Sequence, residues 1–397
     1  MKNNYVQRKI YKDLKDHLQN NDVTILTGMR RTGKTTLVQH LLEDIHSSNK
    51  IFLDLEKISN REIFLDKNYD NVILTLEKQG LNKNERMYIA IDEIQTLPNI
   101  SSVVKYLSDH YDIKFILTGS SSYYLKNLFT ESLSGRKKLF ELFPLDFGEF
   151  LTFKNIPHKT LEKLEGLHKF NSNEYERIKA YYEEYIEYGG FPKVVLASST
   201  KEKKDILDDI ISSYINIDIK NIADFKDSNS IISLVKMLVS RIGNKLDYSK
   251  LSRLTGLSRA TVQNYTALFE KTYLISLVSV HTQNRDREIV KAQKIYFGDN
   301  GLASVLGDID SGSKFENALY NQLKHKAEVK YFSLKNGREI DFILNNEIAF
   351  EAKETPIESD VASLRGLSEK AGISNKNILG RHKAPNFTDY IWGGDIL

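Results

Sequence analysis

The chain of 397 residues is long enough for two or three domains, and a hydrophobic fraction of 41% allows full cores. Its 56 Lys and Arg residues against 53 Asp and Glu leave a net charge of +3, which is too small to imply a polyanion partner for the whole molecule. The absence of cysteine excludes disulfides and metal sites with cysteine ligands.

The first eight residues lack the apolar core of a signal peptide. No apolar run approaches the roughly 18–20 residues that a membrane-spanning helix needs. We therefore expect a cytoplasmic protein without a membrane partner.

A predicted helix within residues 5–20 leads into the first strand, which begins at Val23 and runs into Gly-x4-Gly-Lys-Thr and an apolar helix. Backbone N–H groups at a helix N-terminus wrap phosphates when the turn carries no bulky Cβ atoms. We expect Lys34 to reach the β- and γ-phosphates of ATP and Thr35 to bind Mg²⁺. The simpler alternative is a strand-to-helix turn that contains a lysine. The predicted nucleotide-binding residues are Gly28, Arg30, Arg31, Thr32, Gly33, Lys34, Thr35 and Thr36.

Two further apolar strands are predicted at residues 50–55 and 87–94, and two carboxylates close the second of them. The continuous apolar pattern is typical of parallel strands covered on both faces. We expect Asp92 to assist Mg²⁺, directly or through water, and Glu93 to orient and deprotonate the attacking water. The alternative is an ordinary acidic strand end.

A fourth strand at residues 113–121 ends in small polar residues. Ser120 is predicted to contact the γ-phosphate or the attacking water, and a plain Gly-Ser turn is the alternative.

Three motifs of this N-terminal part form a set: Gly-x-Arg-Arg-x-Gly-Lys-Thr-Thr-Leu at 28–37, Ile-Asp-Glu-Ile-Gln at 91–95 and Leu-Thr-Gly-Ser-Ser at 117–121. The set resembles the predicted prokaryotic ATPases of the AAA superfamily, which carry a C-terminal domain of unknown function. Segments at 132–136, 143–145 and 188–192 also match that family. The resemblance implies a P-loop core of the additional-strand class with Glu93 as the catalytic base.

Arg136 follows a glycine in the loop after the fourth strand, which makes it the best candidate for an arginine finger. Such an arginine neutralises transition-state charge in cis or from a neighbouring subunit, and the second case requires self-association. A surface arginine is the alternative, and Arg30 and Arg31 compete for the role.

Residues 151–225 predict a helical lid or connector that turns at Gly189–Gly190, with its tyrosines in the core. Residues 226–300 predict a winged helix-turn-helix, and the stretch from 231 to 300 carries 11 basic against 5 acidic residues. The elements expected there are helices at 231–242, 248–254 and 258–273, and a hairpin of 275–280 and 289–297 around a charged tip at 284–287.

The third of these helices is the predicted DNA-recognition element. Arg259 and Gln263 lie one turn apart on its exposed face, where they fit the major groove of double-stranded DNA, while Val262, Tyr265 and Phe269 face inward. Winged helices also serve as protein-docking or nucleotide-lid modules, and this alternative stays open.

The C-terminal part, residues 301–397, resembles the PD-(D/E)xK nuclease fold. A helix bearing Glu316 precedes two strands, which carry Asp341 and then Glu351-x-Lys353. The proline of the nuclease motif is absent, because Ile340 precedes Asp341. The tail from residue 365 onward is expected to complete or cover the sheet.

The spacing of this hairpin decides its chemistry. A three-residue connection at 345–347 puts Asp341 opposite Glu351, whereas a two-residue loop puts it opposite Phe350. We predict the first register, in which Asp341 and Glu351 hold Mg²⁺, Glu316 lies above them and Lys353 lowers the pKa of the attacking water. The alternative is a retained fold whose acidic cluster is merely solvated.

The sequence therefore predicts an α/β protein with four parts: a P-loop NTPase domain with a parallel sheet (1–150), a helical connector (151–225), a winged helix (226–300) and a PD-(D/E)xK-like domain (301–397). The expected function is Mg²⁺-dependent ATP hydrolysis coupled to a C-terminal region that interacts with DNA or protein. The alternatives are an ATP-regulated, metal-dependent DNA nuclease and an ATP-gated adaptor that does not hydrolyse ATP.

Overall fold

The computed structural model describes residues 5–120, 133, 135–159, 168–219, 228–282 and 291–397. The chain divides into an N-terminal unit, residues 1–143 with 271–273, and a C-terminal unit, residues 144–270 with 274–397. The three predicted C-terminal parts thus fall almost entirely within one compact unit. Within the described ranges, no helix has both the length and the apolar character that a membrane span requires.

The N-terminal unit is built on a five-stranded parallel sheet in the order β2-β3-β4-β1-β5. The insertion of β4 between β1 and β3 is the arrangement that the additional-strand class implies. Strand β5 was not predicted from the sequence. The strands are β1 (Val23–Thr27), β2 (Lys50–Asp54), β3 (Met87–Asp92), β4 (Ile113–Gly119) and β5 (Lys137–Glu141).

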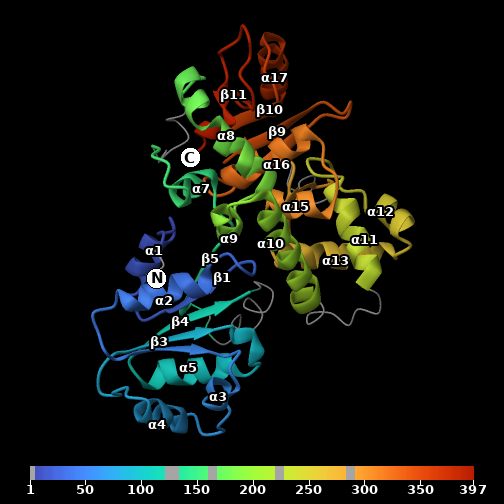
Figure 1. Ribbon diagram of the computed structural model, residues 1–397. Helices are drawn as coiled ribbons and strands as arrows, with labels where there is room; N and C mark the ends of the chain where they lie inside the picture. The colour runs from blue at the N-terminus through green and yellow to red at the C-terminus, as the bar shows by residue number, and fades with distance from the viewer. Residues whose placement is uncertain (1–4, 121–132, 134, 160–167, 220–227, 283–290) are drawn as a thin grey trace. The chain divides into compact units, whose positions relative to one another are not determined.

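Helices cover both faces of this sheet (Figure 1). Alternate residues of β3 enter different cores: Ile89 and Ile91 pack with α4 and α5, and Ala90 packs with α1 and α2. A strand buried on both faces explains the continuous apolar run in the sequence. The helices are α1 (Tyr11–His17), α2 (Lys34–Glu43), α3 (Ile58–Glu62), α4 (Asp70–Lys78) and α5 (Ile100–His110), with a 3₁₀ turn η1 (Ile94–Thr96).

The predicted connector is helical and belongs to the core of the C-terminal unit. Tyr182 and Tyr185 of α8 are buried, as expected from the sequence. Helix α8 ends at Gly189, whose φ of 73° is the left-handed conformation that glycine adopts readily. The helices are α7 (Phe147–Phe153), α8 (Ser172–Tyr188), α9 (Pro192–Leu196) and α10 (Thr200–Ser213), followed by a π-helical segment η3 (Tyr214–Ile219).

The next elements follow the order predicted for a winged helix. They are α11 (Ser228–Val239), α12 (Tyr248–Thr255), α13 (Arg259–Lys271), and the antiparallel strands β6 (Ile275–Val278) and β7 (Lys294–Phe297). The side chain of Asp247 caps α12, and Gly256 ends it in the left-handed conformation. The predicted charged tip at 284–287 lies outside the described residues.

A second five-stranded sheet has the order β12-β11-β10-β9-β8, and the tail both extends it and covers it with α17. Leu344 pairs with Ile348 and Phe342 pairs with Phe350, which confirms the three-residue connection. The same register, continued by one residue, puts Asp341 opposite Glu351. The elements are α15 (Asn300–Leu306), α16 (Ser311–Leu323), β8 (Val329–Ser333), β9 (Glu339–Leu344), β10 (Ile348–Lys353), α17 (Glu358–Ala371), β11 (Asn375–Gly380), β12 (Ile391–Trp392) and a 3₁₀ turn η4 (Gly393–Asp395).

Lys114 of β4 is expected to make the stability of the N-terminal unit depend on pH. Its Nζ is buried and donates to Asn20 Oδ1 at 3.1 Å, and burial, helped by Arg86, lowers its pKa from 10.5 to about 7. Between these two values the unfolded chain binds the proton and the folded chain releases it, so the free energy of unfolding rises with pH. We expect a slope of up to roughly 1.4 kcal/mol per pH unit above pH 7. Urea denaturation at pH 7, 8 and 9 should show a shallower slope in Lys114→Met, and equal slopes would contradict this account.

Candidate phosphate-binding and carboxylate sites

The turn between β1 and α2 has the backbone that the phosphate-loop motif requires. Gly28, Arg31 and Gly33 have φ angles of 149°, 64° and 97°. A Cβ atom on Gly28 would lie 2.1 Å from the carbonyl oxygen of Leu142, so only glycine fits there. The turn therefore presents its backbone at the N-terminus of α2 without side-chain obstruction at Gly28.

Two basic side chains hold this turn from within. Lys34 is buried, and its Nζ donates to the carbonyl oxygens of Gly28 at 2.8 Å and Met29 at 2.9 Å. Arg8 donates to the carbonyl oxygens of Thr32 at 2.9 Å and Phe143 at 2.8 Å. Arg8 was not predicted, because a single arginine before the first helix carries no sequence signal for this role.

The predicted metal residues lie together at the carboxyl ends of the parallel strands. Thr35 Oγ1 donates to Asp92 Oδ2 at 2.7 Å, and Thr118 Oγ1 donates to Asp92 Oδ1. A hydroxyl and a carboxylate are hard oxygen ligands of the kind that Mg²⁺ prefers. The structure thus brings together Thr35 and Asp92 as the sequence predicted.

Glu93 follows Asp92 in the left-handed conformation, with φ of 55°. Burial raises the pKa of Glu93 above its usual value, while Lys34 and Arg30 act in the opposite direction. The side-chain amide of Gln95 donates to the Glu93 carboxylate and, at 3.1 Å, to Ser120 Oγ. Glu93 and Ser120 therefore share one hydrogen-bonding partner, Gln95, which the sequence analysis did not single out although it lies in the motif.

Arg136 lies at the amino end of the parallel strands, whereas the phosphate loop lies at their carboxyl end. This is the wrong end for a finger acting in cis. The carbonyl oxygen of Arg136 accepts from the backbone N–H of Val23 at 2.9 Å, at the start of β1, and its side chain pairs with Asp109. The phosphate loop follows the other end of β1, about 16 Å away along a five-residue strand. Of the two alternatives left open by the sequence, this position does not fit a finger acting in cis, because the unpredicted β5 is parallel to β1 and begins at the end of the strands opposite the phosphate loop.

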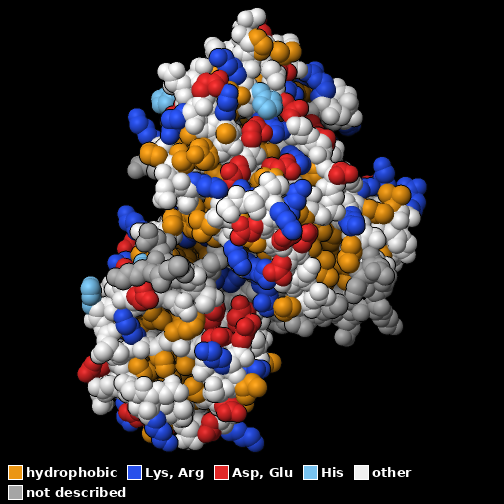
Figure 2. Space-filling model, viewed as in Figure 1, with side chains coloured by type: hydrophobic (Ala, Val, Ile, Leu, Met, Phe, Trp, Pro, Cys, Tyr) orange, Lys and Arg blue, Asp and Glu red, His pale blue; other side chains and the backbone are white. Residues whose placement is uncertain are grey.

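On α13 the predicted recognition residues Arg259 and Gln263 are exposed, and Val262 and Phe269 are buried. Ser258 Oγ accepts from the backbone N–H of Thr261 at 3.1 Å and so caps the first turn of the helix. Figure 2 shows Lys and Arg side chains at the surface around the neighbouring α12.

In the C-terminal unit the four predicted nuclease-like residues lie in one cluster of ionisable groups. Lys353 Nζ lies 2.9 Å from Glu351 Oε1, and Asp341 Oδ2 accepts from the backbone N–H of Ala352 at 3.0 Å. Burial, helped by Asp341, raises the pKa of Glu316 to about 7 and that of Glu351 to about 8. Among the described residues, no group of three or more His, Asp or Glu side chains is arranged to hold a metal ion.

The sequence analysis missed three members of this cluster: Lys294, Tyr296 and Glu339. Lys294 of β7 reaches Glu316, Glu339 and Asp341. Burial opposes the charge on Lys294, but the three carboxylates outweigh it and raise its pKa. Alternation along β7 puts Lys294 and Tyr296 on one face, yet the sequence does not say which carboxylates that face meets.

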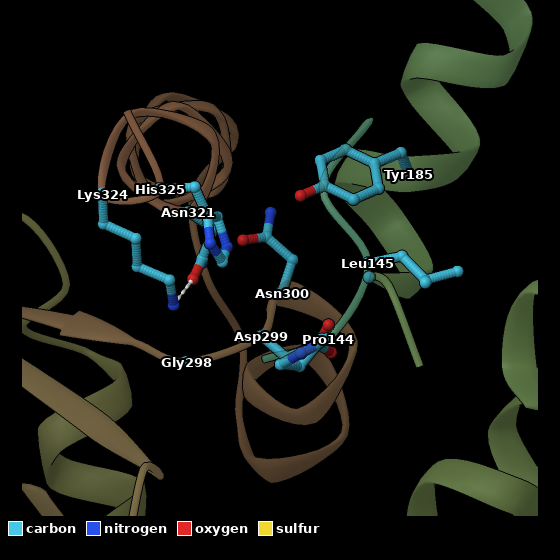
Figure 3. A pocket seen from close by; sticks show the side chains of 10 residues that line it. Pro144, Leu145, Tyr185, Gly298, Asp299, Asn300, Asn321, Lys324 and His325 are labelled. Carbon is cyan, nitrogen blue, oxygen red and sulfur yellow. Dashed lines mark hydrogen bonds between the residues drawn. The ribbon is translucent and has the colours of Figure 1, made fainter. Parts of the chain in front are cut away.

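A small pocket lies beside Gly189, in the segment at 188–192 (Figure 3). The Asp299 carboxylate accepts from the backbone N–H of Gly190 at 2.7 Å, and burial raises the pKa of Asp299 to about 6. The pocket holds about 10 Å³, room for about one water molecule, so it is too small for a nucleotide. Its lining is Pro144, Leu145, Tyr185, Gly189, Gly298, Asp299, Asn300, Asn321, Lys324 and His325.

Comparison with known proteins matches two segments to family models. Residues 20–151 match the AAA domain, and residues 179–313 match a domain of unknown function (DUF8612). An uncharacterized protein of Methanocaldococcus jannaschii is 25% identical over 385 residues, covering 93% of this chain and 84% of that protein. An uncharacterized protein of Haemophilus influenzae is 26% identical over 380 residues, covering 90% of this chain and 88% of that protein.

Solved structures with partial similarity include two proteins of Aeropyrum pernix. The ORC1 protein in complex with DNA aligns with a TM-score of 0.32 and 12% identity, over 75% of this chain and 90% of that chain. The ORC2 protein in its ADP form aligns with a TM-score of 0.38 and 11% identity, over 69% and 89%. At these scores neither structure informs the arrangement of the present chain. Residues 20–151 thus match the AAA domain, and the parallel sheet of this part of the chain has the P-loop NTPase fold.

Proposed function

We propose that the N-terminal unit binds ATP with Mg²⁺ and hydrolyses it. The observation that carries this proposal is the 2.7 Å contact of Thr35 Oγ1 with Asp92 Oδ2, with the half-buried Glu93 next in the chain. The residues fit the nucleotide, because Gly28 leaves the loop backbone open and Lys34 already lies inside the loop. Bound Mg²⁺ supplies neutralisation of phosphate charge.

Each side chain then has one task. Lys34 binds the β- and γ-phosphate oxygens, and Thr35 and Asp92 hold the metal. Glu93 accepts a proton from the attacking water, and burial, which raises its pKa above the usual value, makes it a stronger base than an exposed glutamate. Gln95 orients the Glu93 carboxylate and Ser120 through its hydrogen bonds to both.

The test is phosphate release from ATP by the full-length protein with Mg²⁺ and with EDTA. We expect steady release with the metal and none with the chelator. ATP that binds in the presence of Mg²⁺ but yields no phosphate over hours would overturn hydrolysis and favour the adaptor.

Arg136 enters the proposal only as a residue that acts on a neighbouring molecule. It is exposed at the amino end of the parallel strands, opposite the end that carries the phosphate loop, and 61% of its side chain is accessible. A finger in trans requires self-association, so the turnover per molecule should rise with protein concentration in the wild type and stay flat in Arg136→Ala.

We further propose that α13 contacts double-stranded DNA. Each of Arg259→Ala and Gln263→Ala is expected to weaken binding to a duplex by about tenfold, because base contacts of this kind contribute roughly 1–3 kcal/mol. Fluorescence anisotropy at low and moderate salt measures this effect, and Lys201→Ala, an exposed charge change on α10, is the control. Unchanged affinity in both α13 variants would assign the helix to protein docking instead.

Metal-dependent DNA cleavage is the second candidate, and the hairpin register favours it by placing Asp341 opposite Glu351. The residues do not fit a metal ion in this structure, because Lys294 lies against Asp341 and Glu316. Plasmid DNA with Mg²⁺ or Mn²⁺ tests the candidate directly: nicking that disappears in Asp341→Ala would establish it.

A further inference from the structure

The carboxylate cluster of the C-terminal unit already contains a cation. Lys294 is 1% exposed, and its Nζ lies 3.0 Å from Glu339 Oε1, 3.1 Å from Asp341 Oδ1 and 3.4 Å from Glu316 Oε1. These partners come from α16 and β9, whereas the lysine comes from β7. Because a buried ammonium group is costly unless it is paired, the three carboxylates and the lysine stabilise one another.

These carboxylates also have partners other than Lys294. Asp341 Oδ2 accepts from the backbone N–H of Ala352 at 3.0 Å, and Glu339 Oε2 pairs with Lys245 at 2.9 Å. Glu316 Oε1 accepts from the Tyr296 hydroxyl at 2.6 Å. A metal ion could bind here only by displacing existing partners.

Glu316 is enclosed on its second side by the segment after α11. A Cβ atom on Gly243 would lie 2.6 Å from Glu316 Oε2, and the backbone N–H of Gly243 donates to the carbonyl oxygen of Ile295 at 2.9 Å. The segment that covers Glu316 is thus hydrogen-bonded to the same strand that carries Lys294.

We propose that the ammonium group of Lys294 occupies the position that a divalent cation would take among the carboxylates of the C-terminal unit. These carboxylates therefore bind Mg²⁺ or Mn²⁺ only when the ammonium group is removed or moves away. Removal of the ammonium group leaves Glu316, Glu339 and Asp341, the three carboxylates that converge on it, as oxygen ligands for a hard cation. The inference does not depend on ATP hydrolysis or DNA cleavage, because it concerns cation binding alone.

The experiment is a titration of nucleotide-free protein with Mn²⁺, in which electron paramagnetic resonance counts the free ion. Lys294→Met is expected to bind about one Mn²⁺ per chain at least tenfold more tightly than the wild type. The double variant Lys294→Met with Asp341→Asn should lose this gain, which separates the site from any Mn²⁺ at Asp92. Lys353→Met is the matched control, because it removes a lysine that pairs with Glu351 and leaves Lys294 in place.

Three results would overturn the proposal. They are the absence of any gain in a folded Lys294→Met, a gain that survives Asp341→Asn, and wild-type Mn²⁺ binding that Asp341→Asn abolishes. The last comparison needs only the wild type and Asp341→Asn, so it holds even if Lys294→Met does not fold. Circular dichroism of every variant checks the fold, and Lys294→Gln repeats the test with a polar side chain.

Discussion

Replacement of Glu93 by glutamine is expected to lower ATP turnover by about 100-fold or more while ATP still binds. Glutamine keeps the size and the hydrogen-bonding capacity of the side chain but cannot accept the proton of the attacking water. The contact of Gln95 with residue 93 should survive, so the site keeps its shape. Phosphate release and binding of a fluorescent ATP analogue, measured on the same preparation, separate catalysis from affinity.

The matched control for this variant is Glu56→Gln, which makes the same chemical change at an exposed position after β2. It should turn over ATP like the wild type. Lys34→Ala should differ from Glu93→Gln by losing ATP binding as well, because the lysine binds the phosphates themselves. Wild-type turnover by Glu93→Gln would exclude Glu93 as the base.

Gly190→Ala is expected to destabilise the C-terminal unit by about 3 kcal/mol. The new Cβ atom would lie 2.1 Å from the carbonyl oxygen of Leu145, which is backbone and cannot rotate away. Relief of that clash would break the hydrogen bond from the N–H of Leu145 to the carbonyl oxygen of Gly190 and the one from the N–H of Gly190 to Asp299. Urea denaturation followed by circular dichroism measures the loss.

Gly366→Ala is the control for this prediction. Gly366 lies in the interior of α17, and a Cβ atom there meets nothing within 4 Å. Alanine should therefore stabilise the unit by about 0.5–1 kcal/mol through its helix propensity. Equal effects of the two glycine substitutions would show that the close approach at Leu145 does not matter.

The N-terminal site was predictable because its chemistry is concentrated in short contiguous segments. The β1 strand, the two glycines and Lys34 specify the loop locally. An apolar strand that ends in Asp92 indicates a buried parallel strand with this carboxylate at its carboxyl end. The hairpin register of Asp341 and Glu351 was predictable for the same reason, since three residues of loop fix it.

The residues that were missed depend on partners distant in the sequence. Lys294 meets Asp341 across 47 residues, and Arg8 meets Phe143 across 135. The cis and trans roles of Arg136 stayed open because β5 was not recognised: its residues, Lys-Lys-Leu-Phe-Glu, bury only Phe140 and give a weak strand pattern. Because β5 is parallel to β1, the chain must return to the amino end of the strands before β5 begins. Local spacing in the sequence does not reveal this return.

The sole tryptophan of the chain, Trp392, lies in the C-terminal unit with 1% of its surface exposed. Its indole N–H donates to the carbonyl oxygen of Arg381 at 2.9 Å, and the rings of Tyr175 and Tyr182 lie edge-on to it. Excitation at the red edge of tryptophan absorption therefore produces emission from this unit alone. A shift of that emission when ATP is added to the protein would be an optical signature that nucleotide binding at the phosphate loop changes the surroundings of Trp392 in the C-terminal unit.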